Sequence, residues 1–175
     1  KQAGVSAQQV QVIWIKHGNI GPSQDGEFPK HAKAMTDQLG IIVRMAKEKF
    51  PNARLCFLSN RTYAGYSRGT LNPEPYAYEN AFSVRWLIEL QVKGDKELNA
   101  DPDKGAVKAP LLLWGPYLWA DGKTARKDDG FTWQPEDVAA DGTHQSPTGS
   151  GKIGELMLTF FKNDPYAKGW FVKGK

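Results

Sequence analysis

Asp141-Gly142-Thr143-His144 is the segment whose residue types and spacing could do chemistry. The Asp-Gly pair predicts a turn, and a carboxylate three residues before a histidine on a turn can accept a hydrogen bond from one ring nitrogen. That bond fixes the tautomer and leaves the other nitrogen free to act as a general base. The same four residues also fit an ordinary turn that ends in an exposed histidine, because short motifs have many chance matches.

Aromatic side chains are concentrated in the segments 61–66 and 114–119. Exposed tyrosine and tryptophan faces with a few polar groups can form the wall of a ligand site, for example for a sugar. The same side chains could instead pack against the edge of a sheet. The candidate ligand-binding residues are Arg61, Tyr63, Tyr66, Trp114, Tyr117 and Trp119.

The elements that would position these residues alternate between strand and helix. The predicted order is strand 11–15, helix 28–50, strand 54–58, helix 76–92, strand 110–114 and a helix that begins near Ser146. This alternation is typical of a three-layer α/β/α fold, in which helices cover both faces of a parallel sheet. We expect one domain over residues 1–175. Ligand sites in such folds lie beyond the carboxyl ends of the strands, where the aromatic loops begin.

Charge and hydropathy argue against nucleic-acid and membrane partners. The chain has 23 Lys and Arg against 19 Asp and Glu, a net charge of +4, and the basic residues are scattered among acidic ones. A nucleic-acid-binding domain would concentrate them in a stripe or patch. No apolar run approaches the roughly 18 residues that a membrane-spanning helix needs.

Few residues are suited to metal or cofactor binding. The single cysteine, Cys56, excludes an intrachain disulfide and a cysteine-rich zinc site, and its apolar surroundings predict burial. The three histidines show no paired spacing, and His31 is expected on the solvated side of its helix. The run 147–152 resembles the end of a phosphate-binding loop but lacks the first glycine and the final hydroxyl. We therefore expect no cofactor and assign Gly149 and Gly151 to close packing at a helix start.

Together with the Asp141 to His144 block, three longer segments resemble the SGNH (GDSL-like) hydrolase superfamily: residues 59–66, 71–79 and 114–122. The resemblance implies a flavodoxin-like three-layer fold, no cofactor, a secreted or periplasmic location and hydrolysis of esters, often acetyl groups on carbohydrates. It assigns His144 as the general base and Asp141 as the acid that orients it. By the same resemblance, Asn19 with Gly18 would stabilise the oxyanion, although the next residue is Ile20 where the family has aspartate.

One family feature is absent from the chain. The family's nucleophilic serine lies in a Gly-Asp-Ser block before the first strand predicted here, and no Gly-Asp-Ser occurs. Three strands are also few for a sheet of this kind. We therefore expect the N-terminal part of the domain, with the nucleophile, to lie upstream of Lys1 or on a second chain. The alternative is a non-catalytic carbohydrate-binding domain on the same scaffold.

Overall fold

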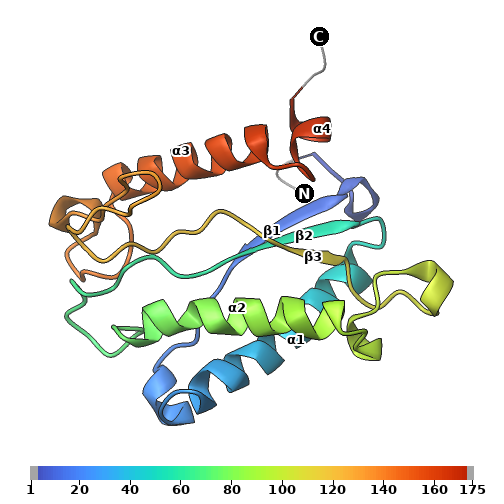
Figure 1. Cartoon of the computed structure of the whole chain (residues 1–175), viewed down its shortest axis with the longest axis horizontal. Helices are drawn as coiled ribbons and strands as arrows, with labels where there is room; N and C mark the ends of the chain where they lie inside the picture. Colours follow the sequence, from blue (N-terminus) through green and yellow to red (C-terminus); the bar gives the residue numbers. More distant parts are fainter. Residues whose placement is uncertain (1–3, 173–175) are drawn as a thin grey trace.

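The computed structural model describes residues 4–172 and contains a parallel sheet with helices on both of its faces (Figure 1). The strands are β1 (Val12–Lys16), β2 (Leu55–Ser59) and β3 (Leu111–Trp114). The helices are α1 (Lys30–Lys49), α2 (Tyr76–Val92), α3 (Pro147–Asn163) and the short α4 (Lys168–Phe171). None of these helices combines the length and the apolar character needed to cross a membrane.

The sheet has the strand order β1-β2-β3, and both pairs are parallel, which confirms the predicted α/β class. Parallel neighbours need crossover connections, and these are right-handed. Two successive crossovers in the same direction therefore carry α1 and α2 to one face, while α3 and α4 lie on the other (Figure 1). The carboxyl ends of all three strands lie at the same end of the sheet, where Lys16 is in register with Ser59.

Alternate residues of β2 contact the two helical layers. Cys56 and Leu58 face α1 and α2, and Phe57 faces α3, where it contacts Phe161 edge-to-face at 5.4 Å between ring centroids. Full burial of an apolar side chain as large as Leu or Phe stabilises the folded state by about 1.5–3 kcal/mol. The predicted burial of Cys56 is confirmed; it raises the pKa of the thiol to about 12, so Cys56 stays protonated and unreactive.

The two edges of the sheet differ. Beside β3, the amide of Gln91 accepts from the Leu112 backbone N–H and donates to the Pro110 carbonyl, so this side chain occupies the outer edge. β1 is half-buried along its whole length, and within residues 4–172 it pairs with β2 alone. Trp14 packs toward α3, whereas Ile15 packs toward α1 and α2. β1 is thus an apolar edge strand with one side open.

Two local predictions are wrong. His31, expected in solvent, is 4 % exposed and its Nε2 lies 2.7 Å from Glu79 Oε2, because this side of α1 faces α2. A methyl group on Gly151 would meet no atom within 4 Å, so close packing does not explain this glycine. Gly149 confirms its prediction, since a Cβ there would lie 2.0 Å from the Asp137 carbonyl oxygen.

Candidate functional site

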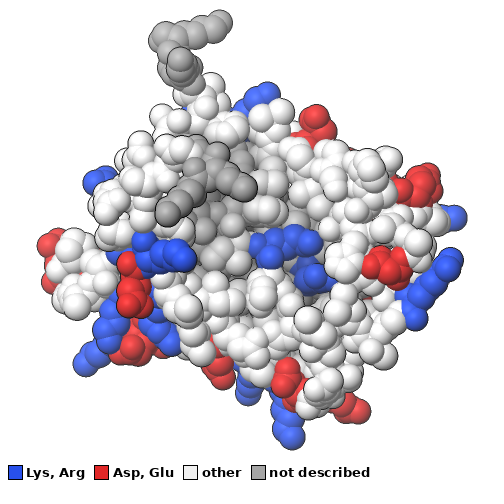
Figure 2. Space-filling model, turned by 180° about the vertical axis from the view of Figure 1, so that it is seen from behind, with Lys and Arg blue, Asp and Glu red and all other residues white. Residues whose placement is uncertain are grey.

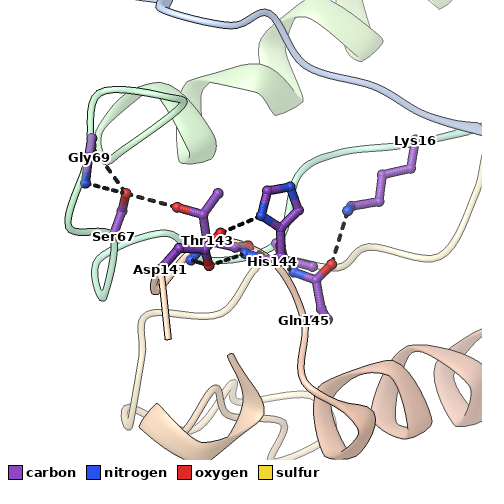
Figure 3. Close-up of polar contacts among 8 residues, drawn as sticks. Lys16, Ser67, Gly69, Asp141, Thr143, His144 and Gln145 are labelled. Atoms are coloured by element: carbon purple, nitrogen blue, oxygen red, sulfur yellow. Dashed lines mark hydrogen bonds and ion pairs between the residues drawn. The ribbon is translucent and has the colours of Figure 1, made fainter. Parts of the chain in front are cut away.

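Asp141 and His144 form the predicted contact (Figure 3). Asp141 Oδ2 lies 2.5 Å from His144 Nδ1, and Oδ1 accepts from the backbone N–H groups of Thr143 at 2.9 Å and His144 at 3.0 Å. Gly142 lies between them at φ +69, and a Cβ there would lie 1.8 Å from the Tyr66 carbonyl oxygen. Only glycine fits this turn, and the turn brings the carboxylate back onto the ring.

The electrostatics of the turn favour an ionised Asp141 beside the imidazole of His144. The bond from the His144 ring and the two backbone bonds hold the pKa of Asp141 below its usual range. An ionised carboxylate can only accept, so the hydrogen bond places a ring proton on Nδ1, and Nε2 is not bonded to Asp141. Both side chains are open to solvent, with 69 % of the His144 side chain exposed. The free ring nitrogen is accessible to a reacting group.

The turn is held from two sides. Ahead of α3, the Ala139 N–H donates to the His144 carbonyl at 2.7 Å, and the Ser146 hydroxyl caps the helix by accepting from the Gly149 N–H. On the other side, the Arg68 N–H donates to the Asp141 carbonyl at 3.2 Å. The histidine is therefore fixed to both α3 and the loop that follows β2.

Three serine hydroxyls of this chain that could be considered as nucleophiles are engaged elsewhere. Ser59 Oγ donates to the Pro116 carbonyl at 2.7 Å, and Ser83 Oγ donates to the Ala32 carbonyl at 2.9 Å; both serines are buried. Ser67 Oγ accepts from the Thr143 hydroxyl. In the part of the chain that the structure describes, no serine is hydrogen-bonded to the His144 ring.

The predicted oxyanion residues lie at the end of β1. Asn19 Nδ2 donates to Asp25 Oδ2 at 3.3 Å, so its amide is bonded to the loop before α1. The side chain of Arg61 packs against Gly18: a Cβ added to Gly18 would lie 2.7 Å from Arg61 Cδ. No hydrogen bond or ion pair among residues 4–172 joins either residue to the His144 ring, and their role stays a prediction.

Three of the predicted aromatic residues cluster beside the turn. The rings of Tyr63 and Tyr66 meet edge-to-face at 5.2 Å, and Tyr63 also contacts Trp119 at 6.2 Å. Glu74 orders this cluster, since its Oε1 accepts from Trp119 Nε1 at 2.9 Å. The backbone of Tyr66 touches Gly142, so the cluster adjoins the Asp141–His144 turn.

Tyr117 and Trp114 each line a hollow of the molecule. Tyr117 lines a hollow of about 810 Å³ together with Phe131 and residues of α3. Trp114, 37 % exposed, lines a second hollow of about 1010 Å³ along the outer side of β3. His144 lines neither hollow. Of the six candidate residues, Tyr117 and Trp114 therefore line two different hollows.

Lys16 and Gln145 join the site although their residue types alone did not identify them. Lys16 ends β1, and its Nζ lies 3.5 Å from Gln145 Oε1; Gln145 Nε2 in turn donates to Thr62 Oγ1 at 2.8 Å. Arg61, a predicted ligand residue, lies on the same edge of the sheet and acts on the charge of Lys16. A charged residue directly after an apolar strand run was the available signal for Lys16.

Asn80 of α2 keeps the loops at this edge together. Its Oδ1 accepts from the Arg61 N–H at 3.0 Å, and its Nδ2 donates to the His17 carbonyl at 3.2 Å. One buried side chain thus links the segments that follow β1 and β2. Across residues 4–172, no group of three or more His, Cys, Asp or Glu side chains is arranged to hold a metal ion.

Comparison of the chain with protein-family models, with curated proteins and with solved structures found no match. The function is therefore inferred below from the geometry of the site.

Proposed function

We propose that this chain supplies the general base and the orienting acid of a serine-type ester hydrolase of the SGNH kind. The proposal includes the three-layer architecture of that family. The observation that carries the proposal is the Asp141–His144 hydrogen bond with the second ring nitrogen exposed. Asp141 holds the imidazole with the proton on Nδ1, and Nε2 accepts the proton of a serine hydroxyl. The substrate is a small-molecule or carbohydrate ester.

The reaction that this pair serves has two stages. As Nε2 takes the hydroxyl proton, the serine oxygen bonds to the ester carbonyl carbon, and the His144 imidazolium then gives that proton to the departing alcohol. Water, deprotonated by the same nitrogen, releases the acid and restores the serine. The ionised Asp141 stabilises the imidazolium in each stage, which fits the lowered pKa of its carboxyl group.

The nucleophile in this proposal comes from a segment outside the chain, either upstream of Lys1 or on a second chain. Two observations support this. The hydroxyls of Ser59 and Ser83 are buried and donate hydrogen bonds to backbone carbonyls. In addition, β1 is a half-buried, apolar edge strand with one side open. A parallel strand added along β1 would end near Lys16, at the carboxyl end of the sheet, where His144 lies.

Aromatic faces support a carbohydrate ester as substrate. Tyr63 and Trp119 are both partly exposed, and they lie in the cluster next to the turn. Aromatic rings bind the apolar faces of sugars, while neighbouring polar groups fix orientation. Figure 2 shows basic and acidic side chains interspersed around one face rather than a broad basic stripe, so nucleic acid is a poor fit.

Hydrolysis of 4-nitrophenyl acetate by the protein encoded by the complete natural reading frame tests the proposal. We expect His144→Ala to lower kcat/KM by more than about a thousandfold, because the base handles the proton in both stages. His17→Ala is the matched control, since His17 is also exposed at this edge, and it should keep full activity. Equal rates for wild type and His144→Ala would overturn the proposal.

The alternative is a non-catalytic carbohydrate-binding domain, which the engagement of the Ser59 and Ser83 hydroxyls in other bonds favours. It predicts that acetylated sugars bind without turnover and that His144→Ala leaves binding intact. The hydrolysis experiment separates the two functions, since a binding domain shows no His144-dependent rate.

A further inference from the structure

Two cationic side chains, those of Lys16 and Arg61, lie at the carboxyl end of the sheet next to His144. β1 and β2 are parallel and in register from Lys16 to Ser59, so the end of β1 lies beside the segment that carries Arg61. Lys16 Nζ reaches Gln145, the residue after His144. In Figure 3, His144 lies between Asp141 on one side and the Lys16 side chain on the other.

Neither cation has a carboxylate partner within ion-pair distance among residues 4–172. Lys16 has only the neutral amide of Gln145, and the Nε of Arg61 is buried with no hydrogen-bond partner. Burial lowers the pKa of both groups, and the charge of Arg61 lowers that of Lys16 further. Two like charges are thus held close together and partly removed from water.

Glu74 is the acidic group that acts on Arg61, yet its oxygens serve the loop. Oε1 accepts from the Ala64 N–H at 2.9 Å and from Trp119 Nε1 at 2.9 Å, and Oε2 accepts from the Tyr78 N–H at 3.0 Å. Three donors that order the aromatic cluster therefore occupy this carboxylate. It attracts Arg61 from a distance without pairing with it.

Packing explains the stem of Arg61 but not its charge. The Cδ and Cγ atoms of Arg61 lie closely over Gly18, a contact that an apolar side chain of similar length could also make. Keeping a guanidinium and an ammonium here, partly desolvated and mutually repelling, lowers stability unless an anion compensates. Uncompensated charge at the carboxyl end of parallel strands is a mark of a ligand site.

We propose that Lys16 and Arg61 form an anion-binding subsite beside His144, which receives a carboxylate, sulfate or phosphate group of the molecule bound there. The guanidinium supplies a directed fork of N–H donors, and the ammonium supplies a compact charge. The inference rests on the proposed function in one respect only: it makes the ester substrate an acidic one, such as an acylated uronic acid. Binding of the anion itself requires no hydrolysis.

Titration of the ¹⁵N-labelled chain with sodium glucuronate and, separately, with glucose tests the subsite. We expect saturable amide shifts around Lys16 and Arg61 with glucuronate and none with glucose. Inorganic sulfate and phosphate should compete for the same amides. Lys16→Met should weaken glucuronate binding at least about tenfold, because it removes one of the two charges.

Matched variants make the result decisive. Lys33→Met removes an exposed lysine of α1 and should bind like wild type, and Lys16→Arg keeps the charge and should restore affinity if Lys16→Met loses it. Equal binding of glucuronate and glucose, unchanged affinity in Lys16→Met, or non-saturable shifts spread over the surface would each overturn the subsite.

Two outcomes separate this inference from the proposed function. Glucuronate binding without any His144-dependent hydrolysis would contradict the hydrolase alone. His144-dependent hydrolysis with no preference for the acidic sugar would contradict the subsite alone.

Discussion

Lys16 makes the stability of the protein depend on pH in a direction that can be worked out. Burial, and secondarily the charge of Arg61, lower its pKa from the ordinary 10.5 to about 8. In the unfolded chain the amine binds its proton with the ordinary pKa, so between pH 8 and 10.5 the unfolded state holds more protons than the folded state. The free energy of unfolding therefore rises with pH through this window.

The expected size follows from the two pKa values. A drop from 10.5 to about 8 corresponds to roughly 3 kcal/mol of destabilisation when the amine is charged. Most of this, about 2–3 kcal/mol, is recovered between pH 7 and pH 10. Lys16→Met removes the titrating group. Its stability advantage over wild type should accordingly shrink by about 2–3 kcal/mol across that interval.

Urea unfolding at pH 7, 8.5 and 10 measures the effect for wild type, Lys16→Met and Lys33→Met. Other groups titrate alike in the three proteins, so only the differences between them are compared. The Lys33→Met difference should stay flat, because Lys33 is exposed. A Lys16→Met difference that is equally flat would refute the conclusion that a desolvated charge lies at the end of β1.

Two further substitutions test how the site is held. Gly142→Ala should lower the free energy of unfolding by at least about 2 kcal/mol, because alanine is strained at φ +69 and its methyl group would meet the Tyr66 carbonyl; thermal unfolding measures this, and Gly69→Ala, which has open space, should be neutral. Lys152→Met removes the partner of the buried Asp137 carboxylate at 2.5 Å and should cost about 3 kcal/mol in urea unfolding. Loss of less than about 1 kcal/mol would show that this ion pair does not anchor the start of α3.

Features encoded locally could be predicted from the sequence. The bounds of α2 match the prediction of 76–92, and α3 begins at Pro147 with Ser146 as its cap, as the residue types indicated. The contact between Asp141 and His144 belongs to the same class, since both partners lie on one turn. Such features depend on spacing within a few residues, which the sequence displays directly.

Features that depend on the register between strands could not be predicted. Lys16 meets Gln145 only because the β1 end and the turn before α3 converge on one edge of the sheet. The prediction for His31 is wrong for a similar reason, because its side of α1 meets Glu79 of α2, a residue far along the chain. The separation of Trp114 from Trp119 likewise follows from the path of the chain after β3.

The protonation of the His144 ring tests the central claim most directly. Long-range ¹H–¹⁵N correlation spectra of the neutral ring in alkaline buffer distinguish the two tautomers. The structure predicts a proton on Nδ1 and a bare Nε2 in wild type, with Asp141→Asn losing this preference. A proton on Nε2 in wild type, unchanged in Asp141→Asn, would mean that Asp141 does not orient the imidazole and that the chain presents no prepared base.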